Sequence, residues 1–404
     1  MLSVKDNTFC ISKNTLNANP QIYVAVVVFN EFRNDSRVEK ISLSLAKQGM
    51  EVKVYATAGI GLPRTEKRPN YQVLRPYEAK SPVKRAGRII SSLGTFFLLL
   101  EGIRKIDLIH CNDLEPLLFC VWLKIITFGR IKIIYDAHEL ETEKNAAKGL
   151  RKHLSKFLEA RLISKVDAFI TVSPSIAEWY RKVYALENPT VVLNCPYYHE
   201  VNQTDLLRES LGIPQHKIIF LFQGGFSPKR GLPQLIKVFE SADAPTDCVL
   251  VFLGFGSMHK AGMDLQKRIE NASSKGTNIY FHPAVPYSEL LNYTSSADIG
   301  LCLTEDTCLS HRYSLPNKLF EYAMAGIPMI VSDLPEMRKL VQTFDCGEIC
   351  EILAGEGLLV SIRAILSRDL ELLSENALRL ARGYSWEKQE LKLIELYQSL
   401  LPLN

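Results

Sequence analysis

Residues 314–333 of the chain read SLPNKLFEYAMAGIPMIVSD and combine a helix, a strand and several polar side chains. Pro316 suits the first position of a helix, where a missing N–H costs nothing, and Gly326 is a typical helix stop. Residues 328–332 are mostly apolar and predict a short buried strand directly after the helix. A helix that leads at once into a buried strand is typical of α/β folds with a parallel sheet.

The same helix carries groups that suit a phosphorylated ligand. The backbone amides of Asn317, Lys318 and Leu319 lie at its N-terminus, the positive end of the helix dipole, where phosphate binds readily. Lys318 and Glu321 are three residues apart and share one face. A carboxylate at Glu321 could accept hydrogen bonds from vicinal hydroxyls such as those of a ribose. An amphipathic helix with a surface ion pair explains this stretch equally well when it is taken alone.

Composition limits the classes of protein to consider. A chain of 404 residues fits about two domains, and 47% hydrophobic with 23% charged residues is typical of a soluble globular protein. A net charge of +4 gives no reason to expect nucleic acid. No signal peptide pattern is present, and the longest apolar runs are too interrupted to span a bilayer, so we expect a cytoplasmic protein. The cysteines are scattered, which favours reduced thiols over a zinc site at Cys346 and Cys350.

Apolar runs alternate with amphipathic segments through the first half of the chain. Residues 23–29 predict a strand buried on both faces, followed by a helix that closes at Gly49. Further strands are predicted at residues 52–56, 107–111, 132–135, 168–172 and 190–193. This pattern predicts a first Rossmann-like domain over residues 21–197, after a polar tail at residues 1–20. The loop after the first strand has no G-x-G-x-x-G, which counts against a nicotinamide or flavin dinucleotide.

The alternation restarts after a polar stretch near residues 194–207. Strands are predicted at residues 218–223, 249–254, 278–282, 298–303 and 328–332. A second Rossmann-like domain is therefore expected over residues 198–384. The last helix, residues 385–404, is expected to pack back on the first domain. The chain is thus predicted to form two parallel-sheet domains that face each other across a cleft.

Three loops of the second half follow predicted strands and are rich in glycine or small residues. The first reads GGFSPKRG at residues 224–231, where Gly224 and Gly225 let the backbone approach a ligand and Arg230 offers a bidentate fork for phosphate oxygens. Gly254 and Gly256 flank Phe255 after the next strand, and Val285 follows the third. A purely structural tight turn remains an alternative for the first loop.

Together with SLPNKLFEYAMAGIP, these loops resemble the retaining glycosyltransferases of family 4, the group 1 glycosyltransferases with the GT-B fold. The resemblance continues through segments that read FNEFRNDSRV, IHCNDLEPLL, YDAHELETE, ITVSPSIAEWY and YSWEKQELKLIELYQSLL, and covers about residues 20–404. It implies a hexosyl-type transferase that holds a nucleotide diphosphate sugar mainly through the C-terminal domain. The acceptor would approach from the N-terminal domain.

The resemblance also implies roles for individual residues. Glu321 would bind the donor ribose and Arg230 would neutralise the diphosphate, supported by Lys318 and the amides of residues 317–319. The loop at residues 254–256 and Val285 would line the nucleobase pocket. His138 matches a histidine near the sugar that acts in catalysis or hydroxyl recognition, although a structural histidine is the alternative. The acceptor side would include Asn34, Asp35, Arg37 and His138.

Two positions depart from the family pattern. A second glutamate that contacts the donor sugar commonly stands eight residues before Glu321, where this chain has Tyr313. An arginine is common after the first glycine of the phosphate loop, where this chain has Gly225. The first change leaves the donor sugar open, and Glu305 or Asp306 could substitute. With Gly225 in place of that arginine, Arg230 and Lys318 would neutralise more of the diphosphate charge.

We therefore expect a retaining transfer from a nucleotide diphosphate sugar to a glycan or lipid-linked glycan, without metal or cofactor, in the assembly of a surface polysaccharide. A nucleotide-sugar 2-epimerase and a disabled glycosyltransferase-like scaffold remain alternatives, and a NAD-dependent dehydrogenase is more distant.

Basic clusters at Lys80, Lys84, Arg85 and Arg88 and at Lys144, Lys148, Arg151 and Lys152 predict either a solvated helix face or peripheral contact with anionic membrane. The base, sugar, linkage, acceptor and oligomeric state stay open.

Overall fold

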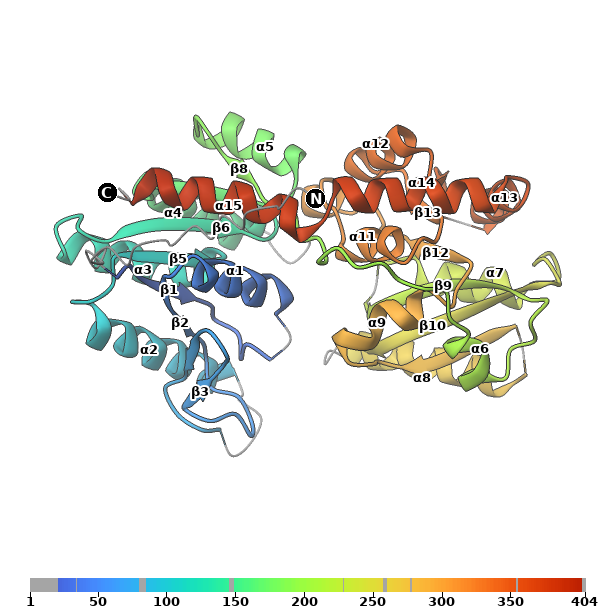
Figure 1. Ribbon diagram of the computed structural model, residues 1–404, viewed down its shortest axis with the longest axis horizontal. Helices are drawn as coiled ribbons and strands as arrows, with labels where there is room; N and C mark the ends of the chain where they lie inside the picture. The colour runs from blue at the N-terminus through green and yellow to red at the C-terminus, as the bar shows by residue number, and fades with distance from the viewer. Residues whose placement is uncertain are drawn as a thin grey trace, which may run out of the picture.

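The computed structural model describes residues 21–33, 35–79, 85–144, 149–227, 229–256, 260–276, 278–353 and 355–401. The expected polar tail and Asn34 lie outside these residues, as does Pro228 of the phosphate loop. Two α/β domains lie next to each other, each built on its own sheet (Figure 1). The predicted α/β fold with two Rossmann-like domains is therefore confirmed.

The N-terminal domain contains a sheet whose strand order is β3-β4-β2-β1-β5-β6-β7-β8. All neighbours pair in parallel except β3 and β4, which are antiparallel. The elements are β1 (Tyr23–Val27), α1 (Ser36–Lys47), β2 (Glu51–Tyr55), β3 (Thr65–Lys67), β4 (Gln72–Leu74), α2 (Arg85–Gly102), β5 (Leu108–Asn112), α3 (Leu114–Ile126), β6 (Lys132–Ala137), the 3-10 turn η1 (Glu141–Glu143), α4 (Gly149–Ile163), β7 (Ala168–Thr171), α5 (Pro174–Tyr184) and β8 (Thr190–Val191).

Strand β1 shows why this sheet is covered on both faces. Its side chains alternate between two buried cores: Val24 and Val26 belong to one, and Ala25 and Val27 to the other. Because successive residues of a strand point to opposite faces, an unbroken apolar run requires packing on both sides. Helix α1 contributes to the first core, and α2, α3 and α5 contribute to the second.

The C-terminal domain has the strand order β11-β10-β9-β12-β13-β14, with every neighbouring pair parallel. After β9 the chain adds strands on one side of the sheet, and from β12 it adds them on the other. A ligand crevice is expected at this switch point, at the carboxyl ends of β9 and β12. The elements are α6 (Leu206–Leu211), β9 (Ile218–Phe226), α7 (Leu232–Glu240), β10 (Cys248–Gly256), α8 (Lys260–Ser274), β11 (Ile279–Pro283), α9 (Tyr287–Thr294), β12 (Ile299–Cys302), α10 (Leu309–Arg312), α11 (Asn317–Met324), β13 (Met329–Ser332), α12 (Pro335–Phe344), β14 (Gly347–Cys350), α13 (Gly355–Leu366), α14 (Leu370–Gly383) and α15 (Trp386–Leu400).

The main differences from the sequence prediction lie at element ends. Strands β9 and β10 continue through their glycine segments and pair up to Gly256 opposite Phe226, so part of the glycine loop is strand. Pro316 is the residue before helix α11 rather than its first residue. The amide of Leu319 donates to the Pro316 carbonyl at 3.1 Å, so it is not one of the free amides expected there.

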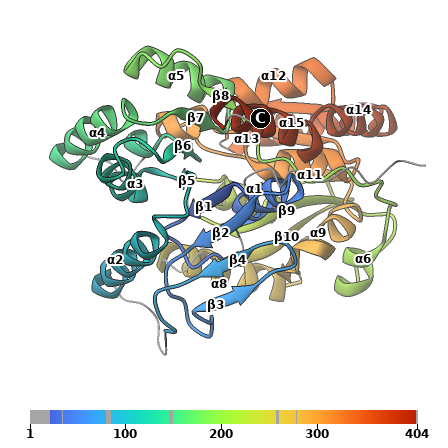
Figure 2. The same cartoon turned by 60° about the vertical axis from the view of Figure 1, so that its left-hand side comes forward.

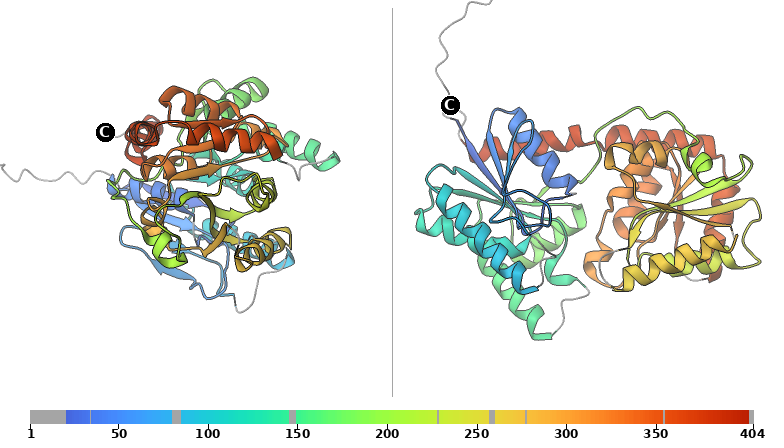
Figure 3. Two further views of the ribbon diagram at one scale, coloured as in Figure 1. Left: turned by 90° about the vertical axis from the view of Figure 1, so that its right-hand side faces the viewer. Right: turned by 90° about the horizontal axis from the view of Figure 1, so that it is seen from below.

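The C-terminal helix α15 leaves the second domain and packs on the first (Figure 3). Trp386, Leu393 and Tyr397 of this helix are buried in the core that contains Val24 and Val26. The indole N–H of Trp386 donates to the Ser44 hydroxyl of α1 at 2.9 Å. The last helix therefore completes the core of the N-terminal domain.

Among the described residues, no helix is both long enough and apolar enough to cross a membrane.

Replacing Trp386 with Ala should destabilise the N-terminal domain by about 3–5 kcal/mol, because it opens a cavity and leaves the Ser44 hydroxyl without its partner. Urea denaturation followed by tyrosine and tryptophan fluorescence measures the free energy of unfolding. Leu391→Ala on the same helix is the control, since Leu391 is 61% exposed. Equal stability of the two variants would show that α15 does not contribute to the core.

Candidate active site

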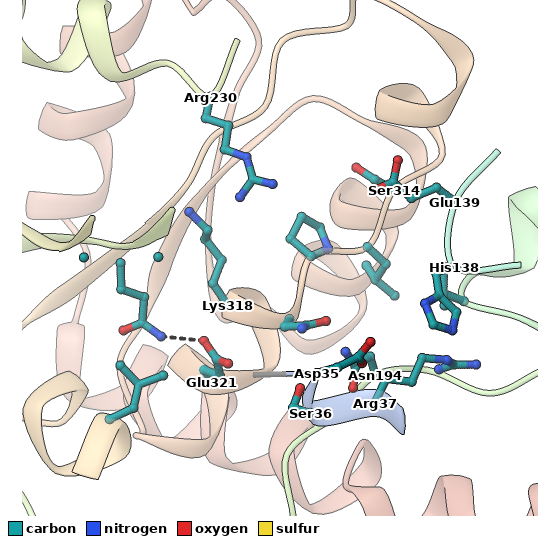
Figure 4. Close-up of a pocket in the computed structure, with 18 of the residues that line it drawn as sticks. Asp35, Ser36, Arg37, His138, Glu139, Asn194, Arg230, Ser314, Lys318 and Glu321 are labelled. Carbon is teal, nitrogen blue, oxygen red and sulfur yellow. Dashed lines mark hydrogen bonds between the residues drawn. The ribbon is translucent and has the colours of Figure 1, made fainter. Parts of the chain in front are cut away.

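A cavity of about 790 Å³ lies between the two domains and is lined by residues of both. The N-terminal domain contributes the segment after β1 and the turn after β6, and the C-terminal domain contributes the ends of β9 and β10 and the start of α11. Figure 4 shows the side chains that converge on it. The lining includes most of the predicted site residues, namely Asp35, Arg37, His138, Gly224, Arg230, Gly254, Val285, Asn317, Lys318 and Glu321.

Two cationic side chains meet on the C-terminal side of the cavity. The Arg230 guanidinium is exposed and points toward the Lys318 side chain (Figure 4). The Lys318 ammonium is buried, has no hydrogen-bond partner among the described residues, and lies 3.5 Å from the centroid of the Phe222 ring. Burial, and then the neighbouring Arg230 charge, lowers the pKa of Lys318 to about 7. A buried cation without a carboxylate partner makes this part of the cavity suited to an anion.

Glu321 is held one helical turn away by a chain of polar side chains. The Gln223 amide donates to Glu321 Oε2 at 2.6 Å, and the Thr294 hydroxyl lies 2.8 Å from Gln223 Oε1. The other carboxylate oxygen of Glu321 has no hydrogen-bond partner in the described part of the chain. Burial raises the pKa of Glu321, although the Gln223 hydrogen bond opposes the shift. Glu321 is thus fixed in position with one oxygen left to bind a ligand.

Glycine is required where β9 and β10 end beside the cavity. Gly224 has φ +109° and Gly254 has φ +155°, both in the region that L side chains rarely adopt. A Cβ atom at Gly254 would lie 2.0 Å from the carbonyl oxygen of Gly224. The two strands therefore approach each other only with glycine at this point. A Cβ atom at Gly224 would have no other atom within 4 Å, so the backbone there borders open space.

The predicted histidine lies on the N-terminal side of the cavity. His138 Nε2 is 3.1 Å from Asn112 Oδ1 and 3.5 Å from Asp136 Oδ2, and Nδ1 is 3.6 Å from Asp113 Oδ2. Burial favours the neutral imidazole, but the Asp113 and Asp136 charges outweigh it and raise the pKa of His138 to about 9. His138 is therefore a cation at neutral pH, held by carboxylates below the cavity surface.

Asp136 is the centre of a buried network that reaches the last helix. Both of its oxygens accept from the Arg37 guanidinium, at 2.8 and 2.9 Å, and Oδ2 is 3.2 Å from His110 Nε2. His110 Nδ1 is 2.8 Å from the Tyr397 hydroxyl on α15. Burial disfavours a charge on Asp136, but Arg37 and the two histidines hold its pKa well below its usual range.

The protonation states of this network follow from its geometry. Burial lowers the pKa of His110, so its ring is neutral and has one donor and one acceptor nitrogen. An ionised carboxylate only accepts, so His110 Nε2–H donates to Asp136, and His110 Nδ1 accepts from the Tyr397 hydroxyl. Helix α15 thus supports the carboxylate that lies next to His138.

Some predicted residues have other contacts than those expected. The Arg37 guanidinium is occupied by Asp136 and by the Val192 carbonyl at 2.7 Å, so its role in this structure is to hold Asp136, and direct contact with an acceptor stays a prediction. Asp35 accepts from the Val38 amide and caps α1. Gly225, Gly256 and Leu319 do not line the cavity, and the Leu319 side chain is fully buried in the core.

The two departures from the family pattern also have a structural setting. Tyr313 does not line the cavity but packs against the core of the N-terminal domain, and its carbonyl accepts from the Ser173 hydroxyl at 2.7 Å. Glu305 binds the Gln234 amide and Asp306 pairs with Arg312, and neither lines the cavity. The position where the family has a sugar-contacting glutamate therefore serves a contact between the domains in this chain.

Several cavity residues were missed in the sequence. They include Glu31, Arg33, Glu139, Asn194, Gln223 and His311. Gln223 could have been predicted as a site residue, because it is a polar residue at the end of an apolar strand and directly before two glycines. His311 lies in the short helix α10. The others lie in loops whose fold depends on distant contacts, such as the Arg75 guanidinium that donates to the Glu31 carbonyl at 3.2 Å.

Replacing Arg37 with Met should destabilise the protein by about 3–5 kcal/mol, because the buried Asp136 carboxylate loses its bidentate cation. The double variant Arg37→Met with Asp136→Leu should lose less than the sum of the single variants. Urea denaturation of the four proteins gives the coupling energy. Additive losses would contradict a direct buried ion pair.

Comparison with known proteins identifies the family. The model of Glycosyltransferase Family 4 matches residues 36–197, and that of Glycosyl transferases group 1 matches residues 203–378. A curated relative, D-inositol 3-phosphate glycosyltransferase from Geodermatophilus obscurus, is 23% identical over 284 residues, which are 66% of this chain and 61% of the relative. The chain therefore spans about three fifths of that relative.

Solved structures show the same fold at low identity. Sucrose-phosphate synthase from Thermosynechococcus elongatus has a TM-score of 0.76 and 17% identity, covering 94% of this chain and 99% of that one. Anabaena HepE in complex with UDP-glucose has a TM-score of 0.70 and 12% identity, covering 94% of this chain and 100% of that one. The expectation from the sequence motifs is confirmed: the chain belongs to the group 1 glycosyltransferases of the family 4 type, with the GT-B fold.

Proposed function

We propose that this glycosyltransferase moves a hexosyl-type sugar, with retention at the anomeric carbon, from a nucleotide diphosphate sugar to a glycan or lipid-linked glycan acceptor. The observation that carries the proposal is the pair of cations at Arg230 and Lys318, which share the cavity with the fixed carboxylate of Glu321. A diphosphate between the cations and a ribose at Glu321 would satisfy all three groups. The UDP-glucose complex of Anabaena HepE supports a nucleotide sugar as the donor class.

The electrostatic role of the cations follows from the bond that breaks. When the anomeric carbon leaves the donor, negative charge develops on the diphosphate oxygens. Arg230 and Lys318 face the position of these oxygens and stabilise that charge without a metal ion. The amides of Asn317 and Lys318 at the start of α11 add partial positive charge from the helix dipole.

The remaining cavity residues would contact either the base of the nucleotide or the acceptor. Gly254 and Val285 lie beside the cavity with Phe255 and form a mostly apolar floor for the base. His138 lies on the opposite side, where a cationic imidazole orients an acceptor hydroxyl or a sugar hydroxyl. The acceptor oxygen bonds to the anomeric carbon on the face from which the diphosphate leaves, which accounts for retention, and the acceptor's proton passes to an oxygen of that diphosphate.

We place the reaction in the synthesis of a cell-surface polysaccharide such as capsule, O-antigen or exopolysaccharide, at the cytoplasmic side of a membrane. The curated relative is named a D-inositol 3-phosphate glycosyltransferase and one structural neighbour a sucrose-phosphate synthase, so the acceptor has to be tested directly. A thermal-shift screen against UDP, GDP, ADP and dTDP sugars, followed by product analysis with and without acceptor, tests the proposal. Isomerisation of the donor without acceptor would indicate a 2-epimerase, and no binding of any nucleotide sugar would indicate a disabled scaffold.

Arg230→Ala and Glu321→Gln should each lower turnover about 100-fold or more, because each removes a group that binds the donor or stabilises its leaving group. Circular dichroism melting should show that both variants remain folded. Lys229→Asn and Glu289→Gln are matched controls, since neither residue lines the cavity and Asn tolerates the positive φ at Lys229. A near-native turnover rate in either site variant would contradict the assignment of that residue to the active site.

Binding of the nucleoside diphosphate should take up protons near pH 8. Lys318 has a pKa of about 7 in the free protein and is mostly neutral at pH 8, whereas a bound diphosphate favours its charged form. Calorimetry of UDP binding in buffers with different ionisation enthalpies measures the uptake. It should vanish in Lys318→Met and shrink toward pH 6, where Lys318 is already charged. An uptake unchanged in Lys318→Met would contradict this role.

A further inference from the structure

Three neighbouring helices of the N-terminal domain, α2, α3 and α4, expose an apolar face that no part of the described chain covers. Figure 2 shows the three helices in a row along one side of the domain. Their exposed apolar side chains, 38–99% accessible, are Ile89, Ile90, Leu93, Phe97, Leu118, Trp122, Ile125, Ile126, Phe128, Leu150, Leu154, Phe157 and Leu158. They are more than half of the large apolar side chains that the described residues expose.

Phe128 shows that this exposure is not explained by folding. Its side chain is 99% exposed, so it packs against nothing in the chain. Its backbone has φ +53°, a left-handed conformation that bulky residues rarely adopt and that Gly or Asn accepts more readily. Neither burial nor local conformation favours Phe at this position. Its apolar ring is therefore more consistent with contact to something outside the chain.

The aromatic side chains beneath the face connect two of the helices. Phe96 lies 5.4 Å from Trp122 and 5.8 Å from Phe97, measured between ring centroids. Trp122 is half exposed at the junction of α2 and α3. Tryptophan with one buried and one exposed side is typical of a residue at the boundary between apolar and polar surroundings.

Charge around the face favours an anionic partner. Basic residues on the three helices outnumber acidic ones: Arg85, Arg88, Lys124, Arg151, Lys152, Lys156 and Arg161 against Glu101, Glu115 and Glu159. Lys124 pairs with Asp167, and Lys152 and Lys156 pair with Glu143, so among the described side chains the basic excess rests on Arg88 and Arg161. Glu159 is fully buried and receives three tyrosine hydroxyls, so it adds little negative charge to the surface. The expected basic residues Lys80, Lys84 and Lys148 lie outside the described residues, as do the side chains of Arg85 and Arg151.

The face begins close to the candidate active site. Strand β6 ends at Ala137, and His138 and Glu139 directly after it line the cavity. The exposed Leu150 lies further along the chain, after η1 and at the start of α4. The turn η1 also contacts α10 of the C-terminal domain. A surface held against α4 would therefore lie near the rim of the cavity.

We propose that this apolar face inserts into the headgroup region of an anionic lipid bilayer and so presents the cavity to an acceptor anchored there. The combination of exposed apolar side chains and an excess of basic residues on adjacent helices is the chemistry of interfacial membrane binding. The position of the acceptor rests on the proposed function, whereas the surface itself does not.

Co-sedimentation of the full-length protein with phosphatidylcholine vesicles, with and without phosphatidylglycerol, tests the proposal. The protein should bind vesicles that contain phosphatidylglycerol, and added salt should weaken the binding. The variant Ile125→Ser, Phe128→Asn and Leu150→Ser should partition about tenfold or more weakly. Its thermal stability should be unchanged, because all three side chains are exposed and Asn suits the left-handed backbone of residue 128.

The matched control is Val360→Ser, Leu372→Ser and Leu391→Ser, which changes three exposed apolar residues of the last three helices. Ile125 and Val360 are 62% and 64% exposed, so these two positions are matched in side-chain exposure. Equal vesicle binding by the two variants would overturn the proposal. Sedimentation velocity without vesicles is the second measurement: a wild-type dimer that becomes monomeric in the first variant would assign the face to a second copy instead.

Binding of UDP without vesicles separates this proposal from the proposed function. It should be equal in wild type and both variants, because the face and the cavity contain different residues. Loss of vesicle binding with intact UDP binding supports the membrane face. Absence of UDP binding in wild type would instead count against the proposed function and leave the vesicle result unaffected.

Discussion

Two positive charges, on Arg230 and Lys318, are kept close together in the cavity between the domains without a carboxylate to balance them. The charged form of Lys318 is unfavourable in the free protein, because burial, and then the Arg230 charge, lowers its pKa. It becomes favourable when an anion lies between the two groups. Gly224 and Gly254, near the ends of β9 and β10, leave space around this position. The start of α11 and the fixed Glu321 direct polar groups toward it. These groups would suit a ligand with adjacent phosphate and hydroxyl groups, as the proposed function requires.

On the opposite wall of the cavity the polar side chains are paired with one another. On the N-terminal side, Arg37, His110, Asp136 and Tyr397 satisfy one another, and His138 lines the cavity next to them. The C-terminal domain therefore offers unpaired groups, whereas the N-terminal domain offers a rigid support. This support depends on α15, the helix that crosses from the second domain to complete the core of the first. One chain segment couples the stability of the N-terminal domain to the position of the C-terminal domain.

Much of the fold was predictable because its signals are local. Unbroken apolar runs such as that of β1 require a sheet covered on both faces, and glycine-rich loops after strands mark the crevice. The short exposed strand β3 lacked such a signal. The Arg37–Asp136 pair joins residues 99 positions apart, so the sequence suggested a ligand contact for Arg37 where the structure shows a buried partner. The same limit applies to Tyr313, whose contact with the N-terminal domain depends on how the domains pack.

The central claim is that the paired cations at Arg230 and Lys318 bind a diphosphate while Glu321 binds the adjoining ribose. A crystal structure of the protein with a bound nucleotide sugar tests this most directly. The account predicts that the diphosphate lies within hydrogen-bond distance of both cations and that the ribose hydroxyls contact Glu321. A nucleotide bound elsewhere, or in this cavity with its phosphates directed away from both cations, would contradict it.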